Sequence, residues 1–338
     1  MIVRDFGNPF NVADYTQEVN LIPNTWGTIG NLGIFQEEGV AEHTITFQEI
    51  QQSFGLILDR VRGDRSNKSQ DYTRKLHSFV APHFPLEDQI LPKDIQGKSA
   101  YSNLSEAETL DAVRMRKMER IRNSHAATLE KARAQLLTAG TIYAPNGTVA
   151  LNFFTEMGVT QTVVDFLFGT TTQNIVAKVE AGISAIQDNV GIVNITGVIA
   201  LCSPVFFGKL ISHANVTTAY TYYTSTQEPL RQRAGGSTTS LHREFFHAGC
   251  LFIEMRDAYA GTPLIPSGDA VMIPTGTDFY KTFFTPAERF GLVNTIGEQV
   301  YFFETPNANG TAIEIDSESN FANAMFKPAL TIRLTSST

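Results

Sequence analysis

The chain has 338 residues with 26 basic and 34 acidic side chains, which gives a formal net charge of -8. This balance argues against a general nucleic-acid-binding protein, because a surface that follows phosphates needs clustered positive charge. The 42% of hydrophobic residues exclude a disordered chain. Only 18% of the residues are charged, against about 25% in an average soluble protein. Such a deficit is typical of a subunit that keeps much of its surface against other chains, and the alternative is an ordinary enzyme with a bland surface.

The beginning of the chain and its two cysteines indicate a reducing compartment. Residues 1–5 include the acidic Asp5 and are followed by Gly7 and polar residues instead of an apolar core, so we expect no signal peptide. No apolar run approaches the length of about 18 residues that a membrane span needs. We expect Cys202 and Cys250 to stay unpaired as small buried thiols.

Residues 1–39 contain Pro9, Pro23 and five glycines, with scattered apolar residues and no sustained period. A segment of this length without packing of its own must lie across another surface to be ordered. We therefore predict an extended arm that adds no core of its own.

A long β-hairpin is predicted after the arm. Ile45 and Phe47 alternate with polar neighbours, which indicates a half-buried strand. The strands expected at 54–61 and 72–80 enclose a segment, 62–71, that is rich in turn-forming residues. Six basic residues make the tip locally positive: Arg60, Arg62, Arg65, Lys68, Arg74 and Lys75. A long two-stranded excursion is not stable alone, so we expect it to need a neighbour.

A long helix is predicted over residues 105–139. Ser105 and Glu108 fit the capping box that marks a helix start, and Gly140 fits a terminal glycine. At about 1.5 Å per residue the rod is about 50 Å long. Apolar spacings of three and four predict that one face packs on a sheet, and a coiled coil is the alternative. The stripe consists of Met118, Ile121, His125, Leu129, Ala132 and Leu136.

The second half of the chain mixes helices and short strands. Asn146-Gly147 predicts a hairpin turn, and apolar residues from Ile175 onward predict a helix that ends near Gly191. A buried strand is expected at 198–201, and Ser203-Pro204 is typical of a helix start. From about residue 241 we expect short strands broken by glycine and proline. The fold class predicted is α+β with segregated elements.

The sequence offers several weak candidate sites. Ligand chemistry is present in His242, Glu244, His247 and Cys250, but these residues are expected in a partly buried strand and not at a metal. We expect His125 to be a packed core residue. The basic run 114–122 is consistent with a DNA-facing surface, although a solvated helix face or salt bridges to an acidic neighbour are favoured. Because no carboxylate pair, triad or nucleotide fingerprint is found, we expect no enzyme, no cofactor and no metal.

Taken together, the order of these parts resembles the shell protein of tailed bacteriophages. Several stretches are similar to the phage lambda type major capsid family: EVNLIP (18–23), RKLHSFVAPHFPLEDQI (74–90), DIQG (94–97), GDAVMIPTG (268–276), FTPA (284–287), VNTIG (293–297), Ser319-Asn320 and Lys327-Pro328. The resemblance spans essentially the whole chain. The chain departs from the family pattern at residues 298–301 and at Phe321, where a proline is usual, which concerns local turns only.

The resemblance implies the Hong Kong 97 capsid fold and a shell function. The implied parts are an N-terminal arm (1–39), an extended loop with its base (40–100), a peripheral domain with a spine helix (101–170), an axial domain (171–290) and return strands of the peripheral domain (291–338). The implied protein forms hexamers and pentamers that close into an icosahedral head around double-stranded DNA. It is assembled in the host cytoplasm and resides in the virion.

The resemblance also implies partners. We expect contacts with sister subunits through Trp26 and the six basic tip residues, because the arm and the hairpin would be ordered only by neighbouring subunits. The other expected partners are a separate scaffolding protein and a portal, with a decoration protein as an optional one. Packaged DNA is expected on the inner face without sequence specificity. A cellular nanocompartment shell that encloses protein cargo, of the encapsulin type, is the alternative function.

Overall fold

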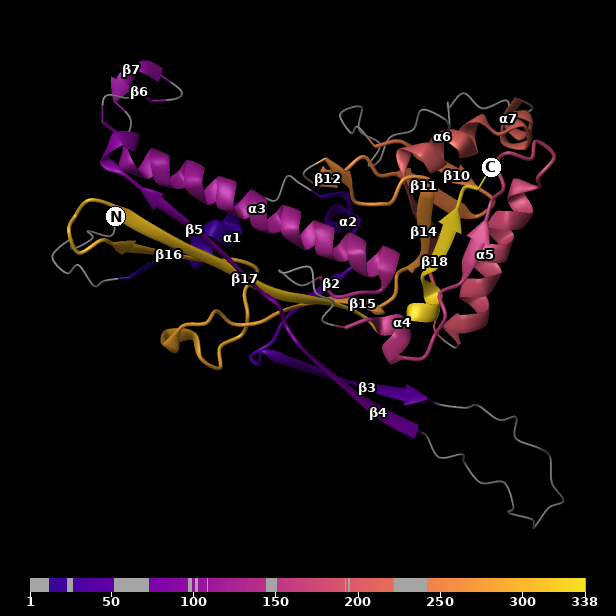
Figure 1. Cartoon of the computed structure of the whole chain (residues 1–338), viewed down its shortest axis with the longest axis horizontal. Helices are drawn as coiled ribbons and strands as arrows, with labels where there is room; N and C mark the ends of the chain where they lie inside the picture. The colour runs from indigo at the N-terminus through magenta and orange to yellow at the C-terminus, as the bar shows by residue number, and fades with distance from the viewer. Residues whose placement is uncertain are drawn as a thin grey trace, which may run out of the picture.

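Two six-stranded sheets and one long helix form the frame of the molecule (Figure 1). The computed structural model describes residues 12–22, 27–51, 73–96, 99–100, 103–107, 109–143, 151–191, 193, 195–221, 242–259 and 261–337. The mixture of helices and strands confirms the α+β fold class. Within these residues, no helix is long and apolar enough to cross a membrane.

The first sheet is elongated, and it follows the length of helix α3. Its strand order is β1 (Ala13–Asp14), β16 (Tyr301–Pro306), β17 (Ile313–Met325), β15 (Tyr280–Phe284) and β2 (Gln36–Gly39), and β5 (His83–Ile90) also pairs with β17. Strand β17 is the axis of this sheet, because its 13 residues pair with β5, β15 and β16.

The second sheet is covered by helices. Its strand order is β10 (Glu244–His247), β11 (Cys250–Glu254), β9 (Gly197–Cys202), β14 (Asp269–Thr275), β18 (Ile332–Thr335) and β8 (Val163–Asp165). The helices of this half are α5 (Ile175–Val190), α6 (Pro204–Ser212) and α7 (Ala214–Thr221). One hydrophobic cluster joins this sheet to α5 and α6, and it contains both cysteines, which are buried and unpaired as predicted.

The remaining elements are short. They are the helices α1 (Thr16–Leu21), α2 (Thr28–Asn31) and α4 (Phe153–Glu156), the 3-10 helices η1 (Pro92–Asp94), η4 (Phe290–Leu292) and η5 (Pro328–Leu330), and the strand pairs β3 (Thr44–Gln51) with β4 (Thr73–Val80), β6 (Ser99–Ala100) with β7 (Asn103–Ala107), and β12 (Ala258–Tyr259) with β13 (Thr262–Pro263). The turn expected at 144–147 lies outside the described residues, but Thr141 and Asn152 form the antiparallel bridge that its flanks require.

Helix α3 (Leu110–Ala139) begins five residues later than the sequence predicts. Residues 103–107 form β7, and the cap is Thr109, whose Oγ1 accepts a hydrogen bond from the Ala112 N–H at 3.2 Å. The predicted capping box is wrong. It is a local signal, and here residues 103–107 form a strand that pairs with β6 instead of starting the helix. The end is confirmed, since Gly140 caps the helix with a φ of 70°.

The face of α3 toward the first sheet carries the predicted stripe. Met118, Ile121, His125, Ala132 and Leu136 are buried, and Leu129 is half-buried. Because this face packs on β17 of the same chain, the coiled-coil alternative is wrong. Four further charged groups on the helix are buried as well, which the apolar stripe did not predict: Arg114, Arg122, Glu130 and Arg133.

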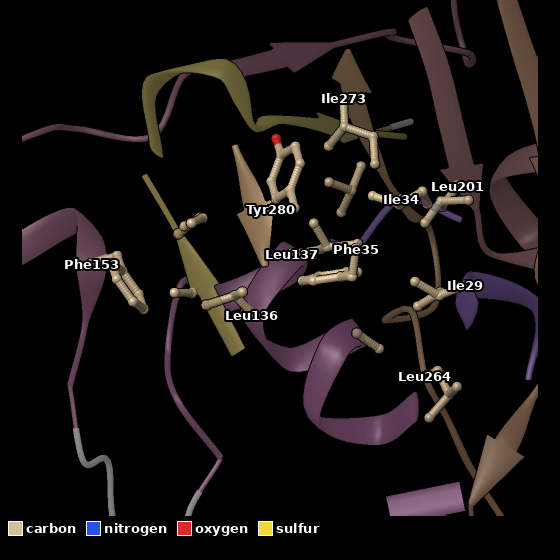
Figure 2. Packing of buried hydrophobic residues seen from close by; sticks show 14 of the residues in the cluster. Ile29, Ile34, Phe35, Leu136, Leu137, Phe153, Leu201, Leu264, Ile273 and Tyr280 are labelled. Carbon is tan, nitrogen blue, oxygen red and sulfur yellow. The ribbon is translucent and has the colours of Figure 1, made fainter. Parts of the chain in front are cut away.

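The expected arm packs on its own subunit, so that expectation is wrong for residues 12–22 and 27–39. Val19 and Ile29 are fully buried, and the Tyr15 N–H donates to the carbonyl of Phe302 at 2.9 Å. Ile29 and Phe35 lie beside the end of α3 in the close view of the main cluster (Figure 2). The segment shows no sequence period because its apolar residues contact α3, β16 and the second sheet in turn.

The base of the hairpin also contributes to the core of its own subunit. Ile45 and Phe79 are buried in the main cluster. The ring of Phe47 lies 5.1 Å from that of His77 and 6.2 Å from that of Phe153 in α4, measured between centroids. The expectation that a neighbour alone orders the hairpin is therefore wrong for β3 and β4, while residues 52–72 lie outside the described residues.

Candidate intersubunit surfaces

The hairpin β3–β4 presents an apolar outer face. It runs out from the two sheets (Figure 1), with Thr44 opposite Val80 and Gln51 opposite Thr73. Leu76 is 66% exposed and Val80 is 61% exposed. These side chains alternate with the buried His77 and Phe79. One face of the hairpin therefore packs on its own subunit, and the opposite face is exposed.

The structure places only part of the predicted contact set. Arg60, Arg62, Arg65, Lys68 and Trp26 lie outside the described residues. Arg74 is in β4 opposite Ile50, and Lys75 is exposed opposite Glu49. The predicted contacts of these residues with neighbouring subunits remain a prediction.

A second surface was not predicted from the sequence. The loop between β15 and β16, residues 286–297, holds Phe290, which is fully exposed, with Val293 at 62% and Ile296 at 72% exposure. The sequence did contain a signal for this surface. Phe290, Val293 and Ile296 recur at every third position, in a segment that fits neither an amphipathic helix nor an alternating strand. We call this surface the 286–297 loop.

One end of the 286–297 loop is fixed through glycine. Gly297 donates its N–H to the carbonyl of Val40 at 3.0 Å, and Val40 donates to the carbonyl of Phe284 at 2.8 Å. A Cβ on Gly297 would overlap the Phe284 carbonyl oxygen, so only glycine lets these backbones approach.

The body of the loop is held by side chains of β17. Arg289 pairs with Asp316 at 2.8 Å, and its guanidinium lies 3.9 Å from the ring centroid of Phe303. Asn320 donates from Nδ2 to the Pro286 carbonyl at 3.0 Å. These contacts hold the exposed apolar side chains on a fixed backbone, which reduces the ordering entropy that docking would cost.

Two open grooves flank the 286–297 loop. One of about 610 Å³ lies between the loop and residues 41–44. The other, of about 740 Å³, lies toward β5 and β17. The carboxylates of the second groove are Asp14, Glu87, Glu288, Asp316 and Glu318, and its basic groups are Arg289 and His83. We call the second one the acidic groove, because its net charge attracts a basic segment.

The basic run 114–122 divides between two environments. Arg114 is buried and pairs with Glu304, with 2.6 Å between Nε and Oε1, and Lys117 pairs with Asp88 at 2.8 Å. Arg116 and Arg120 are exposed. The interpretation as salt bridges to an acidic neighbour is therefore confirmed for Arg114 and Lys117. Among the described parts of the chain, His242, Glu244, His247 and Cys250 form no group that could hold a metal.

Known proteins resemble the chain over nearly its whole length. The family described as phage major capsid protein E matches residues 11–336. The major capsid protein of Pseudomonas phage KPP10 is 44% identical over 96% of this chain and 97% of that protein, and that of Salmonella phage Felix O1 is 24% identical over 98% of each. The capsid structure of cyanophage P-SCSP1u has a TM-score of 0.54 at 9% identity, over 94% of this chain and 90% of that one. The capsid of phage XM1 has a TM-score of 0.51 at 9% identity, over 94% and 95%.

Proposed function

The chain belongs to the phage major capsid protein E family, and from that premise we propose how its surfaces build a shell. It is a major capsid protein with the Hong Kong 97 type of fold, and its place is the capsid of the virion. The nanocompartment alternative is not favoured, because the curated relatives and the capsid structures come from phages. The family is a structural one, and we propose that the chain has no catalytic role.

The subunit forms hexamers and pentamers that close into an icosahedral head around double-stranded DNA. The first sheet with α3 serves as the peripheral domain, and the second sheet with α5 and α6 serves as the axial domain. These units cross the boundaries expected from the sequence, since β8 and β18 belong to the second sheet and β15 to the first. Assembly in the host cytoplasm involves a scaffolding protein and a portal, and a decoration protein is an optional further partner. The net charge of -8 favours weak contact with the DNA, without sequence specificity.

The exposed apolar side chains of the 286–297 loop carry this proposal. Complete burial of a phenylalanine side chain contributes about 1.5–3 kcal/mol. Phe290 contributes none of this within its own subunit, because it is fully exposed there. In a shell the same gain recurs at every copy, so a modest energy per subunit becomes decisive for closure.

The basic hairpin tip and the acidic groove form a complementary pair for two different copies. Residues 60–75 hold six basic and two acidic side chains, while the groove holds five carboxylates. Opposite potentials speed the encounter of two surfaces and fix their register, even where each exposed pair contributes only about 1 kcal/mol or less. Trp26 belongs to the same set of contacts with sister subunits.

The test is a paired measurement on the Phe290→Ser, Ile296→Ser double variant. Both side chains are exposed, so thermal unfolding of the unassembled subunit should match that of the native chain, while particle yield by sedimentation should fall at least tenfold. Val205→Ser is the matched control, because Val205 is 46% exposed on α6, in the other half of the molecule. Normal particles from the double variant would remove the 286–297 loop from the assembly surface.

A further inference from the structure

A small polar cavity lies between α3, residues 299–300 and residues 30–37 of the N-terminal segment. Its volume is about 250 Å³, and its polar lining includes Asn31, Glu37, Arg122, His125, Arg133 and Gln299. We propose that this cavity binds a small oxyanion, a carboxylate or a singly charged phosphate, at the guanidinium of Arg122.

Arg122 has more hydrogen-bond donors than the surrounding protein satisfies. The residue is only 8% exposed. Its Nη2 donates to Gln299 Oε1 at 2.6 Å, whereas its buried Nε has no acceptor among the described residues. An unsatisfied buried donor destabilises the folded state, and a charged donor does so more strongly than a neutral one. The orphan N–H therefore needs an acceptor that the described residues do not supply.

The two guanidinium groups at the cavity, those of Arg122 and Arg133, differ in their partners. Arg133 pairs with Glu37 at 2.8 Å, and Gln299 donates from Nε2 to the same carboxylate. His125 is neutral, because burial and the nearby charge of Arg122 lower its pKa to about 4. Arg133 also faces the buried carboxyl group of Glu130. Among the described residues Arg122 makes no ion pair with a carboxylate, and its side-chain partner is the neutral amide of Gln299. Because a buried charge is stable only when it is paired, Arg122 favours an anion.

The geometry of the guanidinium selects the ligand class. Its planar fork matches the two oxygens of a carboxylate or a phosphate, whereas chloride offers a single acceptor atom. Glu37, on the cavity wall, disfavours an ion with two or more charges. Because Asn31 and Glu37 are exposed, the cavity reaches the surface beside them. The oxyanion is therefore either free in solution or a carboxylate side chain of a neighbouring copy, and the second source rests on the proposed function.

The first experiment uses the unassembled full chain. Thermal unfolding is measured in sodium chloride, sodium acetate and sodium phosphate at pH 6 and matched ionic strength, for the native chain, Arg122→Gln and the control Arg120→Gln, which changes an exposed arginine on the same helix. At an anion concentration tenfold above Kd, the midpoint of the native chain and of the control should rise by roughly 2–4 °C over chloride. Arg122→Gln should show only the general salt effect, which cancels in this comparison.

The second experiment separates the two sources. If a neighbour supplies the carboxylate, the unassembled chain shows no specific rise, and Arg122→Gln lowers particle yield without changing the midpoint of the subunit. Where Arg122→Gln does not fold, Arg122→Lys replaces it, because it keeps the charge and loses the fork. The proposal is overturned if native chain and variant respond equally to every anion and give equal particle yields. Failure of the proposed function is distinct, because then the native chain itself gives no particles.

Discussion

At the scale of single residues, His125 couples the stability of the fold to pH. Its Nε2 lies 3.1 Å from Ser317 Oγ, and the charge that faces it is Arg122. Burial is the main cause that lowers its pKa from 6.5 to about 4, and the Arg122 charge is the second. The folded protein therefore holds His125 neutral, while the unfolded chain takes up a proton below pH 6.5. Stability that is present above this pH is lost as the pH falls from 6.5 toward 4.

We predict that His125→Gln flattens this pH dependence. Between pH 7 and pH 4.5 the native chain should lose about 2 kcal/mol more unfolding free energy than the variant. Urea unfolding at pH 7, 5.5 and 4.5 measures the difference, and carboxylates that titrate in the same range are common to both proteins. Parallel pH profiles would show that His125 is hydrated in the folded state.

At the scale of elements, sequence signals succeed where they are local and are lost where tertiary pairing competes. Ser203 caps α6 as predicted, with its Oγ 3.3 Å from the Phe206 N, and Gly140 ends α3. The start of α3 was missed because residues 103–107, which include Ser105 of the expected capping box, form β7 and pair with β6. The 286–297 loop was missed because its positions are fixed by contacts with Val40 and β17, which are distant in sequence.

The fixed geometry of the 286–297 loop predicts a contrast between two of its glycines. Gly297→Ala should lower the unfolding free energy by about 1–3 kcal/mol, because the new Cβ overlaps the Phe284 carbonyl and forces the backbones apart. Gly291→Ala should be neutral within about 0.5 kcal/mol, because nothing lies within 4 Å of its Cβ position. Urea unfolding of both unassembled variants measures this difference in unfolding free energy. Equal stabilities would mean that the loop can shift, and its exposed side chains would then not be preorganised for docking.

At the scale of the whole molecule, the order of the elements could be predicted from the sequence. Which residues contact their own subunit could not. The α+β class, the hairpin and the long helix follow from period and turn chemistry. The buried Arg114 and Arg122 could not be predicted, because their acceptors, Glu304 and Gln299, come from strands and loops far along the chain. The same holds for the arm. Its apolar residues follow no period in the sequence, because they contact three different surfaces: α3, β16 and the second sheet.

The arm provides the sharpest remaining prediction. Removal of residues 1–11 leaves every described contact in place, so the midpoint of the unassembled subunit should not change. Removal of residues 1–22 takes away Val19 and Tyr15, which are buried against Met118 and Phe302 beneath α3. The lost burial and the opened cavity should lower the unfolding free energy by at least about 3 kcal/mol. Thermal unfolding and particle yield of both truncations separate the two functions of the segment. A stable subunit without residues 1–22 that fails to assemble would show that the arm belongs energetically to neighbouring copies, whereas instability of the shorter chain places residues 12–22 in the core of their own subunit.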